Sequence, residues 1–189
     1  IRMPGGIVAE TFAAAGARTT LLPGSDVYPA LEKGTIDAAD YTGPAVNYEL
    51  GFWQVSKYII MGPASTPCLH QPVDLMDFSV SRRVYDKMSK KTQDLMHQLV
   101  AGYSREHYLA IQEANAKAWP KFREKGIEVI HLSEDDAQRF RQLAIPLWFK
   151  WANKDADAAK FFKMHLDTMM DPAVAIVTDK DIAGHKLNL

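Results

Sequence analysis

The stretch LPGSDVYPALEKGTIDAADYTGP, residues 22–44, alternates short apolar runs with glycine and proline. A short helix is expected to end at Gly34, because glycine readily takes the left-handed conformation that closes helices. Residues 35–40 are expected to form a strand, and a second helix is expected to begin near Pro44, since proline is favoured in a first helical turn. A helix, a strand, a turn and a helix in this order predict an α/β fold.

The aspartates of this stretch have different expected roles. Asp26, together with Ser25, is expected to cap a helix. Asp37 and Asp40 lie three residues apart on the expected strand, so their side chains point to opposite faces and cannot act as a carboxylate pair on one bond. Asp40 ends the strand, where ligands bind in open α/β sheets. It is either a turn former or an oxygen ligand of a hard cation, with Gln71, Asp74 and the main-chain carbonyls beside Asp40 as the nearest suppliers of further oxygens.

Arg2 is the candidate anion-binding residue. It precedes Pro4-Gly5-Gly6 and an expected helix over residues 6–16, whose free N–H groups and dipole favour an anion at the N-terminus. A guanidinium can also hold a carboxylate through two parallel hydrogen bonds. The alternative is an exposed arginine without a ligand.

The rest of the chain continues the α/β pattern and then becomes mostly helical. Residue Pro120 is expected to bend or interrupt the first long helix, and Ser133 is expected to begin the next one. Strands are expected over residues 18–22, 73–81 and 127–132, and helices over residues 91–125, 133–155 and 156–170.

Composition excludes several classes of protein. The 189 residues are 47% hydrophobic, enough for a core, and their net charge of −1 gives no basic surface for nucleic acid. Cys68 is the only cysteine, so neither an internal disulfide nor a thiolate zinc site can form. No apolar run approaches the roughly 20 residues of a membrane helix. The histidines and glycines match no zinc-protease or phosphate-loop motif, and no catalytic set is apparent.

Residues 24–52, GSDVYPALEKGTIDAADYTGPAVNYELGF, closely resemble the stretch G-x-D-[VI]-Y-P-A-L-E-x-G-x-I-D-A-x-[ED]-[WY]-x-G-P of the periplasmic solute-binding subunits of TRAP transporters (DctP type). The similarity extends through IRMPGG before it and DFSVSRRVYDKMSKKTQDLM after it. It implies a periplasmic binding protein-like α/β fold with two lobes and a hinge (type II). The 189 residues would be its C-terminal portion, lacking the N-terminal part of the first lobe, with lobe crossovers near residues 38–45 and 72–82.

The same resemblance implies a receptor of the 2-oxo acid and lactate-binding branch, and not an enzyme. Arg2 would hold the substrate carboxylate. The Asp40 side chain and the Tyr41 carbonyl would bind a calcium or sodium ion that bridges to the substrate, and Tyr41 would also contact the substrate. Gln71 would supply a further metal ligand, and His70 would line the substrate pocket.

The expected location is the periplasm, and the expected partners are a small carboxylate and the TRAP membrane permease. Nucleic acid is not an expected partner. A homodimer is a further expectation, because swapped-helix dimers occur in this branch. The alternative function is a metal-dependent lyase or hydrolase that acts on a small carboxylate, although no histidine or lysine is evidently placed as its general base. A third alternative is a chain that has inherited the fold and binds nothing.

Overall fold

The computed structural model describes residues 1–63 and 78–189 and divides into two units. The described part of the first unit consists of residues 1–41, 60–63 and 129–189, and that of the second consists of residues 42–59 and 78–128. Within the described residues, the chain passes between the units after Tyr41, within strand β1 (Tyr58–Met61) and within strand β2 (Glu128–His131). The crossovers near residues 38–45 and 72–82 stay predictions.

Three extended segments run parallel in the first unit. Residues 1–3 lie between the other two, and Arg2 forms a parallel bridge with Thr20 on one side and with Ala39 on the other. Main-chain hydrogen bonds of 2.9 Å join Arg2 N to Ala38 O and Asp40 N to Arg2 O. Met3 in the central segment is fully buried, so the pairing also anchors the start of the chain in a core.

These pairings are shorter than the sequence predicts. The strands expected over residues 18–22 and 35–40 reduce to the single bridge residues Thr20 and Ala39. The N–H groups of Thr35 and Ile36 instead bond to Ala30 O, at 2.9 and 3.3 Å, and close the preceding helix. Asp37 therefore lies in a bend, and the prediction that it shares a strand with Asp40 is wrong.

Helix α2 (Gly24–Glu32) begins earlier than predicted. Its N-cap is Pro23, whose φ of −54° and ψ of 149° are the usual angles of proline in an extended conformation. The predicted cap at Asp26 or Ser25 is wrong, because both residues lie inside the first turn and the N-cap position is occupied by Pro23. The charge of Asp26 still favours this position, since it opposes the positive end of the helix dipole. The predicted end is confirmed, with Gly34 at a φ of 65°.

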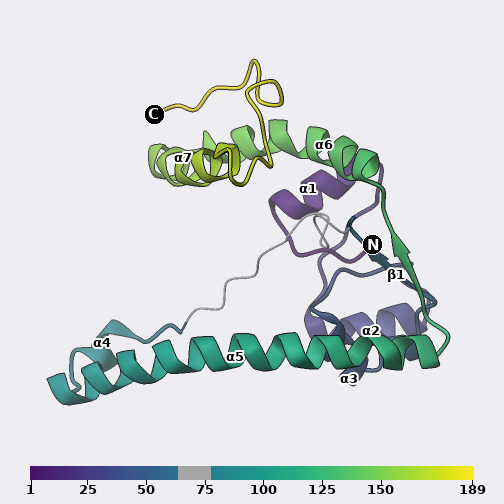
Figure 1. Ribbon diagram of the computed structural model, residues 1–189, viewed down its shortest axis with the longest axis horizontal. Helices are drawn as coiled ribbons and strands as arrows, with labels where there is room; N and C mark the ends of the chain where they lie inside the picture. The colour runs from purple at the N-terminus through teal and green to yellow at the C-terminus, as the bar shows by residue number, and fades with distance from the viewer. Residues whose placement is uncertain (64–77) are drawn as a thin grey trace. The chain divides into compact units, whose positions relative to one another are not determined.

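The other helices in the described part of the first unit are α1 (Ile7–Ala14), α6 (Glu134–Ala152) and α7 (Ala156–Met170), and all three were predicted. Helix α6 packs against both α1 and α7 (Figure 1). Its N-terminus has the capping box that the sequence indicates, with Ser133 and Asp136 bonded to each other's main chain. A core forms between α6, α7 and the C-terminal segment, and its buried members are Ile145, Phe149, Leu166 and Val177.

Asp181 fixes the C-terminal segment to α6. Its Oδ1 accepts hydrogen bonds from Gln138 Nε2 at 3.0 Å and Gln142 Nε2 at 2.7 Å. Its Oδ2 accepts from Thr178 N at 2.9 Å and Thr178 Oγ1 at 2.6 Å. Because Thr178 and then the two glutamines donate to the ionised form, the pKa of Asp181 is lowered from its ordinary value of 3.8. The carboxylate thereby holds Val177, whose side chain is 1% exposed, in the core.

Substituting Asp181 by alanine is expected to lower the free energy of unfolding by about 1–2 kcal/mol at neutral pH, because hydrogen bonds to a charged but partly solvated group are lost. A lowered pKa in the folded state gives stability that is complete above the unfolded-state pKa and is lost as the pH falls through the folded-state pKa. Urea unfolding should therefore show the full difference from wild type at pH 7, and the difference should shrink as the pH falls below the ordinary pKa of 3.8. The exposed neighbour Asp179 is the matched control, and an equal loss in Asp179→Ala would contradict the role of Asp181.

The second unit is built on the long helix α5 (Lys90–Glu124), which packs against α3 (Pro44–Glu49). Its core residues are Ala118, Phe122 and Ile127, with Tyr48 and Trp53 packed against them. Pro120 lies inside α5 and does not end it, so the helix is not interrupted there, and the alternative that Pro120 bends it stays a prediction. The unit also contains the short helices η1 (Phe52–Gln54) and α4 (Arg82–Tyr85).

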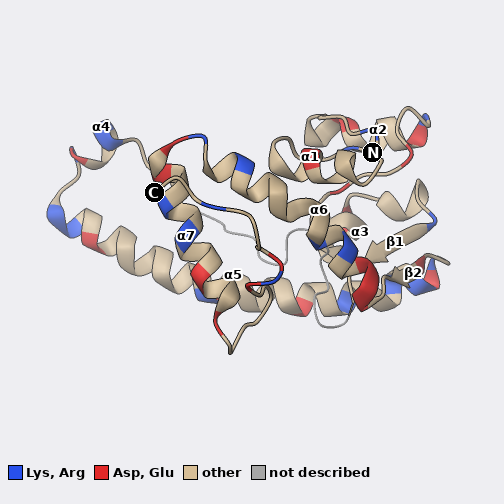
Figure 2. Ribbon diagram, turned by 90° about the horizontal axis from the view of Figure 1, so that it is seen from above, with Lys and Arg blue, Asp and Glu red and all other residues tan. Residues whose placement is uncertain are grey.

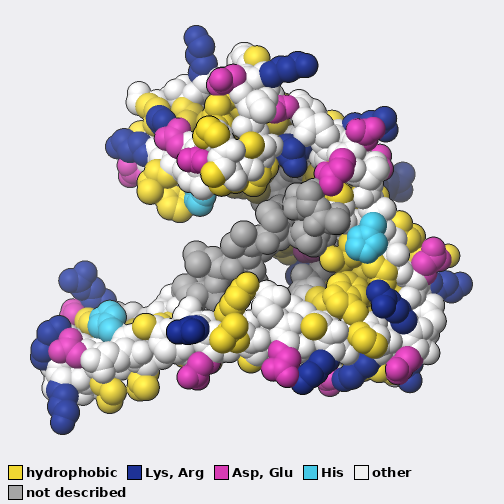
Figure 3. Space-filling view, in the orientation of Figure 1, with side chains coloured by type: hydrophobic (Ala, Val, Ile, Leu, Met, Phe, Trp, Pro, Cys, Tyr) yellow, Lys and Arg dark blue, Asp and Glu magenta, His cyan; other side chains and the backbone are white. Residues whose placement is uncertain are grey.

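The N-terminal half of α5 exposes apolar side chains (Figure 3). Leu99 and Tyr103 are 63% and 58% exposed, whereas the buried residues of the helix, Ala118 and Phe122, lie near its C-terminal end. Charges of both signs also occur along the helix, with an ion pair of 2.7 Å between Lys90 and Asp94 (Figure 2). No helix among the described residues is long and apolar enough to cross a membrane.

Strands β1 and β2 form a sheet of two strands. Glu128 N bonds to Lys57 O and Leu132 N bonds to Met61 O, both at 3.0 Å. The residue numbers of both partners increase by four from the first bond to the second, so the two strands are parallel. Strand β2 was predicted, whereas β1 was not. The strand predicted over residues 73–81 lies mostly outside the described residues, and residues 78–81 are not in a strand.

Candidate functional site

Arg2 is held at the end of the three parallel segments by its own side chain. Its Nε donates to Leu22 O at 3.2 Å, and its Nη1 donates to Asp40 O at 2.8 Å. Each carbonyl belongs to one of the two segments that flank residues 1–3. Within the described part of the chain, these bonds use two of the five N–H donors of the guanidinium, so donors remain for an anion. The side chain is only partly buried, which leaves it within reach of a ligand.

Asp40 and Tyr41 lie beside Arg2, as expected of residues that share a site. The Tyr41 ring centre is 5.7 Å from the guanidinium carbon of Arg2, a distance typical of a cation–π contact. Asp40 is tied to Arg2 at both main-chain groups, since its N–H donates to Arg2 O and its carbonyl accepts from Arg2 Nη1. The three residues thus gather at the carboxyl ends of the parallel segments, where open α/β folds bind ligands.

The oxygen atoms that Asp40 and Tyr41 offer suit a hard cation better than a transition metal. Asp40 offers a carboxylate and Tyr41 a main-chain carbonyl, and oxygen ligands of this kind hold calcium or sodium. Among residues 1–63 and 78–189, no three or more His, Cys, Asp or Glu side chains cluster as a metal site. An ion at Asp40 would therefore take further oxygens from carbonyl, amide or ligand groups. His70 and Gln71, the other predicted site residues, lie outside the described residues.

Leu22 and Gly24 also belong to the site, although the sequence did not indicate them. Leu22 contributes only its main-chain carbonyl to Arg2, and a main-chain acceptor leaves no signature in the residue type. Gly24 begins helix α2 at a point where Tyr41 approaches closely. The proline-glycine pair at residues 23–24 is the sequence signal that could have indicated a close approach here.

The chain enters the second unit directly after Tyr41, and the next residues are firmly bonded. Asn47 Oδ1 accepts from Thr42 N at 3.2 Å and Thr42 Oγ1 at 3.0 Å, and Asn47 Nδ2 donates to Thr42 O at 2.9 Å. Asn115 of α5 caps the start of α3 through a 3.0 Å bond from Ala45 N to its Oδ1. The passage after the candidate site is therefore fixed within the second unit by side-chain hydrogen bonds.

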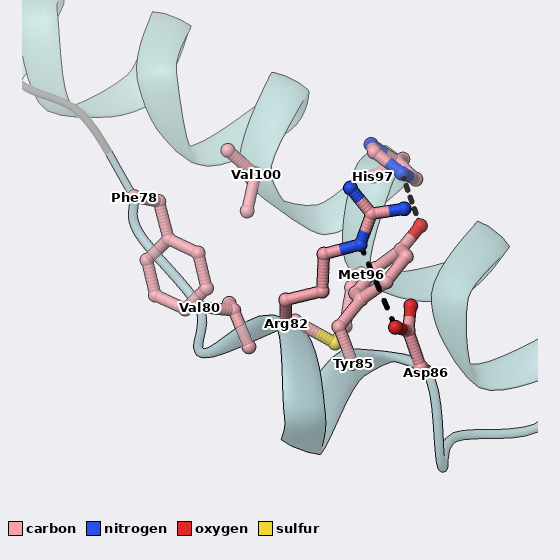
Figure 4. A pocket seen from close by; sticks show the side chains of 8 residues that line it. All are labelled: Phe78, Val80, Arg82, Tyr85, Asp86, Met96, His97 and Val100. Carbon is pink, nitrogen blue, oxygen red and sulfur yellow. Dashed lines mark hydrogen bonds and ion pairs between the residues drawn. The ribbon is translucent and has the colours of Figure 1, made fainter.

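A pocket of about 390 Å³ lies in the second unit between α4 and the N-terminal part of α5 (Figure 4). Its polar side chains satisfy one another, since Tyr85 Oη is 2.9 Å from His97 Nε2 and Arg82 pairs with Asp86 at 3.5 Å. Arg2, Asp40 and Tyr41, the predicted site residues that the structure describes, do not line it. We therefore place the candidate site at Arg2, Asp40 and Tyr41.

The chain belongs to the DctP family, described as bacterial extracellular solute-binding protein, family 7, whose model matches residues 1–155. This match covers most of the chain and confirms the family resemblance read from residues 24–52.

Three relatives illustrate the similarity. A monocarboxylate 2-oxoacid-binding periplasmic protein of Nostoc sp. is 22% identical over 156 residues, which are 82% of this chain and 41% of the relative. A TRAP periplasmic solute-binding protein of Pseudoalteromonas atlantica with bound sodium and pyruvate is 20% identical, with a TM-score of 0.75 over 93% of this chain and 54% of its own. One of Colwellia psychrerythraea with bound calcium and pyruvate is also 20% identical, with a TM-score of 0.75 over 93% and 55%.

These structural similarities confirm the predicted fold class, the two-lobed periplasmic binding protein-like α/β fold. The chain spans about half the length of the relatives that it matches.

Proposed function

We propose that this chain is part of an extracytoplasmic receptor that captures a small monocarboxylate, a 2-oxo acid or lactate, and delivers it to a TRAP membrane permease. The observation that carries the proposal is the anchoring of Arg2 by two main-chain carbonyls beside Asp40 and Tyr41. A guanidinium fixed in this way is preorganised for a carboxylate, because little side-chain entropy remains to be lost on binding.

The substrate carboxylate would bind the remaining N–H donors of Arg2. A calcium or sodium ion would bridge to the substrate and supply positive charge against its oxygens. The Asp40 carboxylate, the Tyr41 carbonyl and Gln71 would hold that ion, and Tyr41 and His70 would line the substrate. One structural relative has bound sodium and pyruvate and the other has bound calcium and pyruvate, which supports this choice of ion.

Transport would follow from a hinge motion between two lobes. A ligand that binds the closed form more tightly than the open form stabilises the closed form, and the difference between the two binding free energies sets by how much. The closed receptor would then dock to the permease in the periplasm. The family's description as extracellular solute-binding protein supports this location, and a homodimer stays an expectation of the resemblance.

A comparison of binding with turnover tests the receptor against an enzyme. We expect the full-length polypeptide to retain pyruvate or lactate in calcium buffer and to release it chemically unchanged, which proton NMR of the recovered acid would show. Conversion of either acid would instead favour the metal-dependent lyase or hydrolase. The family to which the chain belongs consists of solute-binding proteins and gives that alternative no support.

A further inference from the structure

We propose that Gly24 is a positioning residue for Tyr41, and that the missing side chain at residue 24 sets how the Tyr41 ring lies against Arg2. A β-carbon at residue 24 would lie 2.6 Å from Tyr41 Oη, closer than non-bonded atoms approach in proteins. It would also lie 3.5 Å from Tyr41 Cζ and 3.6 Å from Cε2, so the edge of the ring covers this glycine. This inference rests on the proposed carboxylate-binding function.

The need for glycine at residue 24 does not come from the main chain of α2. Gly24 is the first residue of the helix and has no left-handed φ, so alanine fits its conformation. Alanine is also the better helix former by about 1 kcal/mol, although the difference is smaller at a helix end than in its interior. Alanine would therefore favour the helix, and the contact with Tyr41 is what opposes it.

The Tyr41 ring cannot move away from Gly24 without changing the candidate site. Its ring centre lies 5.7 Å from the Arg2 guanidinium carbon, and its main chain directly follows Asp40. A β-carbon at residue 24 would push the ring, through its rigid phenol, out of its place against the guanidinium.

A double-mutant cycle tests this coupling. Calorimetry with pyruvate in calcium buffer would compare Gly24→Ala with wild type, and Gly24→Ala/Tyr41→Phe with Tyr41→Phe, all in the full-length polypeptide. Phenylalanine removes the hydroxyl that would contact the new β-carbon and leaves the nearest ring carbon at an ordinary contact distance. We expect Gly24→Ala to lower the affinity for pyruvate roughly fivefold when Tyr41 is present and less than about twofold when phenylalanine replaces it. The smaller loss is expected because the shortened side chain relieves the strain.

Gly102→Ala is the matched control, because a β-carbon there meets no atom within 4 Å. The proposal requires that Gly24→Ala keep the wild-type melting temperature while losing affinity. Equal losses in both backgrounds, no loss in either, or an unfolded Gly24→Ala protein would overturn it. The wild-type titration reports separately on the proposed function: if wild type binds no pyruvate, that function fails and the role of Gly24 fails with it.

Discussion

Replacing Arg2 by alanine in the full-length polypeptide is expected to weaken pyruvate binding by about 10- to 100-fold, because charge-assisted hydrogen bonds contribute roughly 1.5–3 kcal/mol. The main-chain bridges of residue 2 to Thr20 and Ala39 do not depend on its side chain, so the parallel segments should remain. Calorimetric titration measures the loss, and the melting temperature shows whether the fold is kept.

Two further variants sharpen this prediction. Arg2→Lys keeps the charge but loses the planar fork that bonds Leu22 O and Asp40 O together, so we expect it to restore only part of the affinity. Arg18→Ala removes an exposed arginine from the adjacent segment and should bind as wild type does. Unchanged affinity in Arg2→Ala would contradict the assignment of Arg2 to the substrate carboxylate.

Asp40→Asn is expected to weaken calcium-dependent pyruvate binding by about tenfold, because the amide keeps the size and one oxygen of the carboxylate but removes the charge that holds a hard cation. The main-chain bonds between Asp40 and Arg2 are unaffected by this change. The variant therefore separates the proposed metal role of the side chain from the anchoring of the guanidinium. Titrations with pyruvate, in calcium and after chelation, measure the effect.

Asp37→Asn is the matched control for Asp40→Asn. It makes the same chemical change three residues earlier, at an exposed side chain in the bend before the bridge at Ala39. We expect it to leave calcium-dependent binding as in wild type. If Asp37→Asn and Asp40→Asn had equal effects, or if Asp40→Asn lost affinity equally with and without calcium, Asp40 would not be the metal ligand.

Local signals in the sequence predicted the features that depend on residue type. Gly34 and the Ser133–Asp136 capping box marked helix ends that the structure contains. The grouping of Arg2 with Asp40 and Tyr41 followed from the family motif, since nothing in the spacing of residues 2 and 40 indicates contact. Their binding roles stay predictions.

The features that the sequence did not predict depend on competition between main-chain groups. The strand expected over residues 35–40 lost its first part because Thr35 and Ile36 donate to Ala30 O at the end of α2. The anchoring of Arg2 depends on the carbonyl of Leu22, and any residue type carries a carbonyl. Pro120 stays helical inside α5. The burial of Phe122 in the core offsets the loss of the main-chain hydrogen bond that proline cannot make.

Native mass spectrometry of the full-length polypeptide most directly tests the central claim that a small monocarboxylate binds together with a metal ion. We expect the protein as purified, or after incubation with pyruvate and calcium, to carry the mass of one small carboxylate and one calcium or sodium ion. Arg2→Ala should lose the acid. A wild-type protein that stays at its bare mass after incubation with both pyruvate and calcium would contradict the proposed receptor.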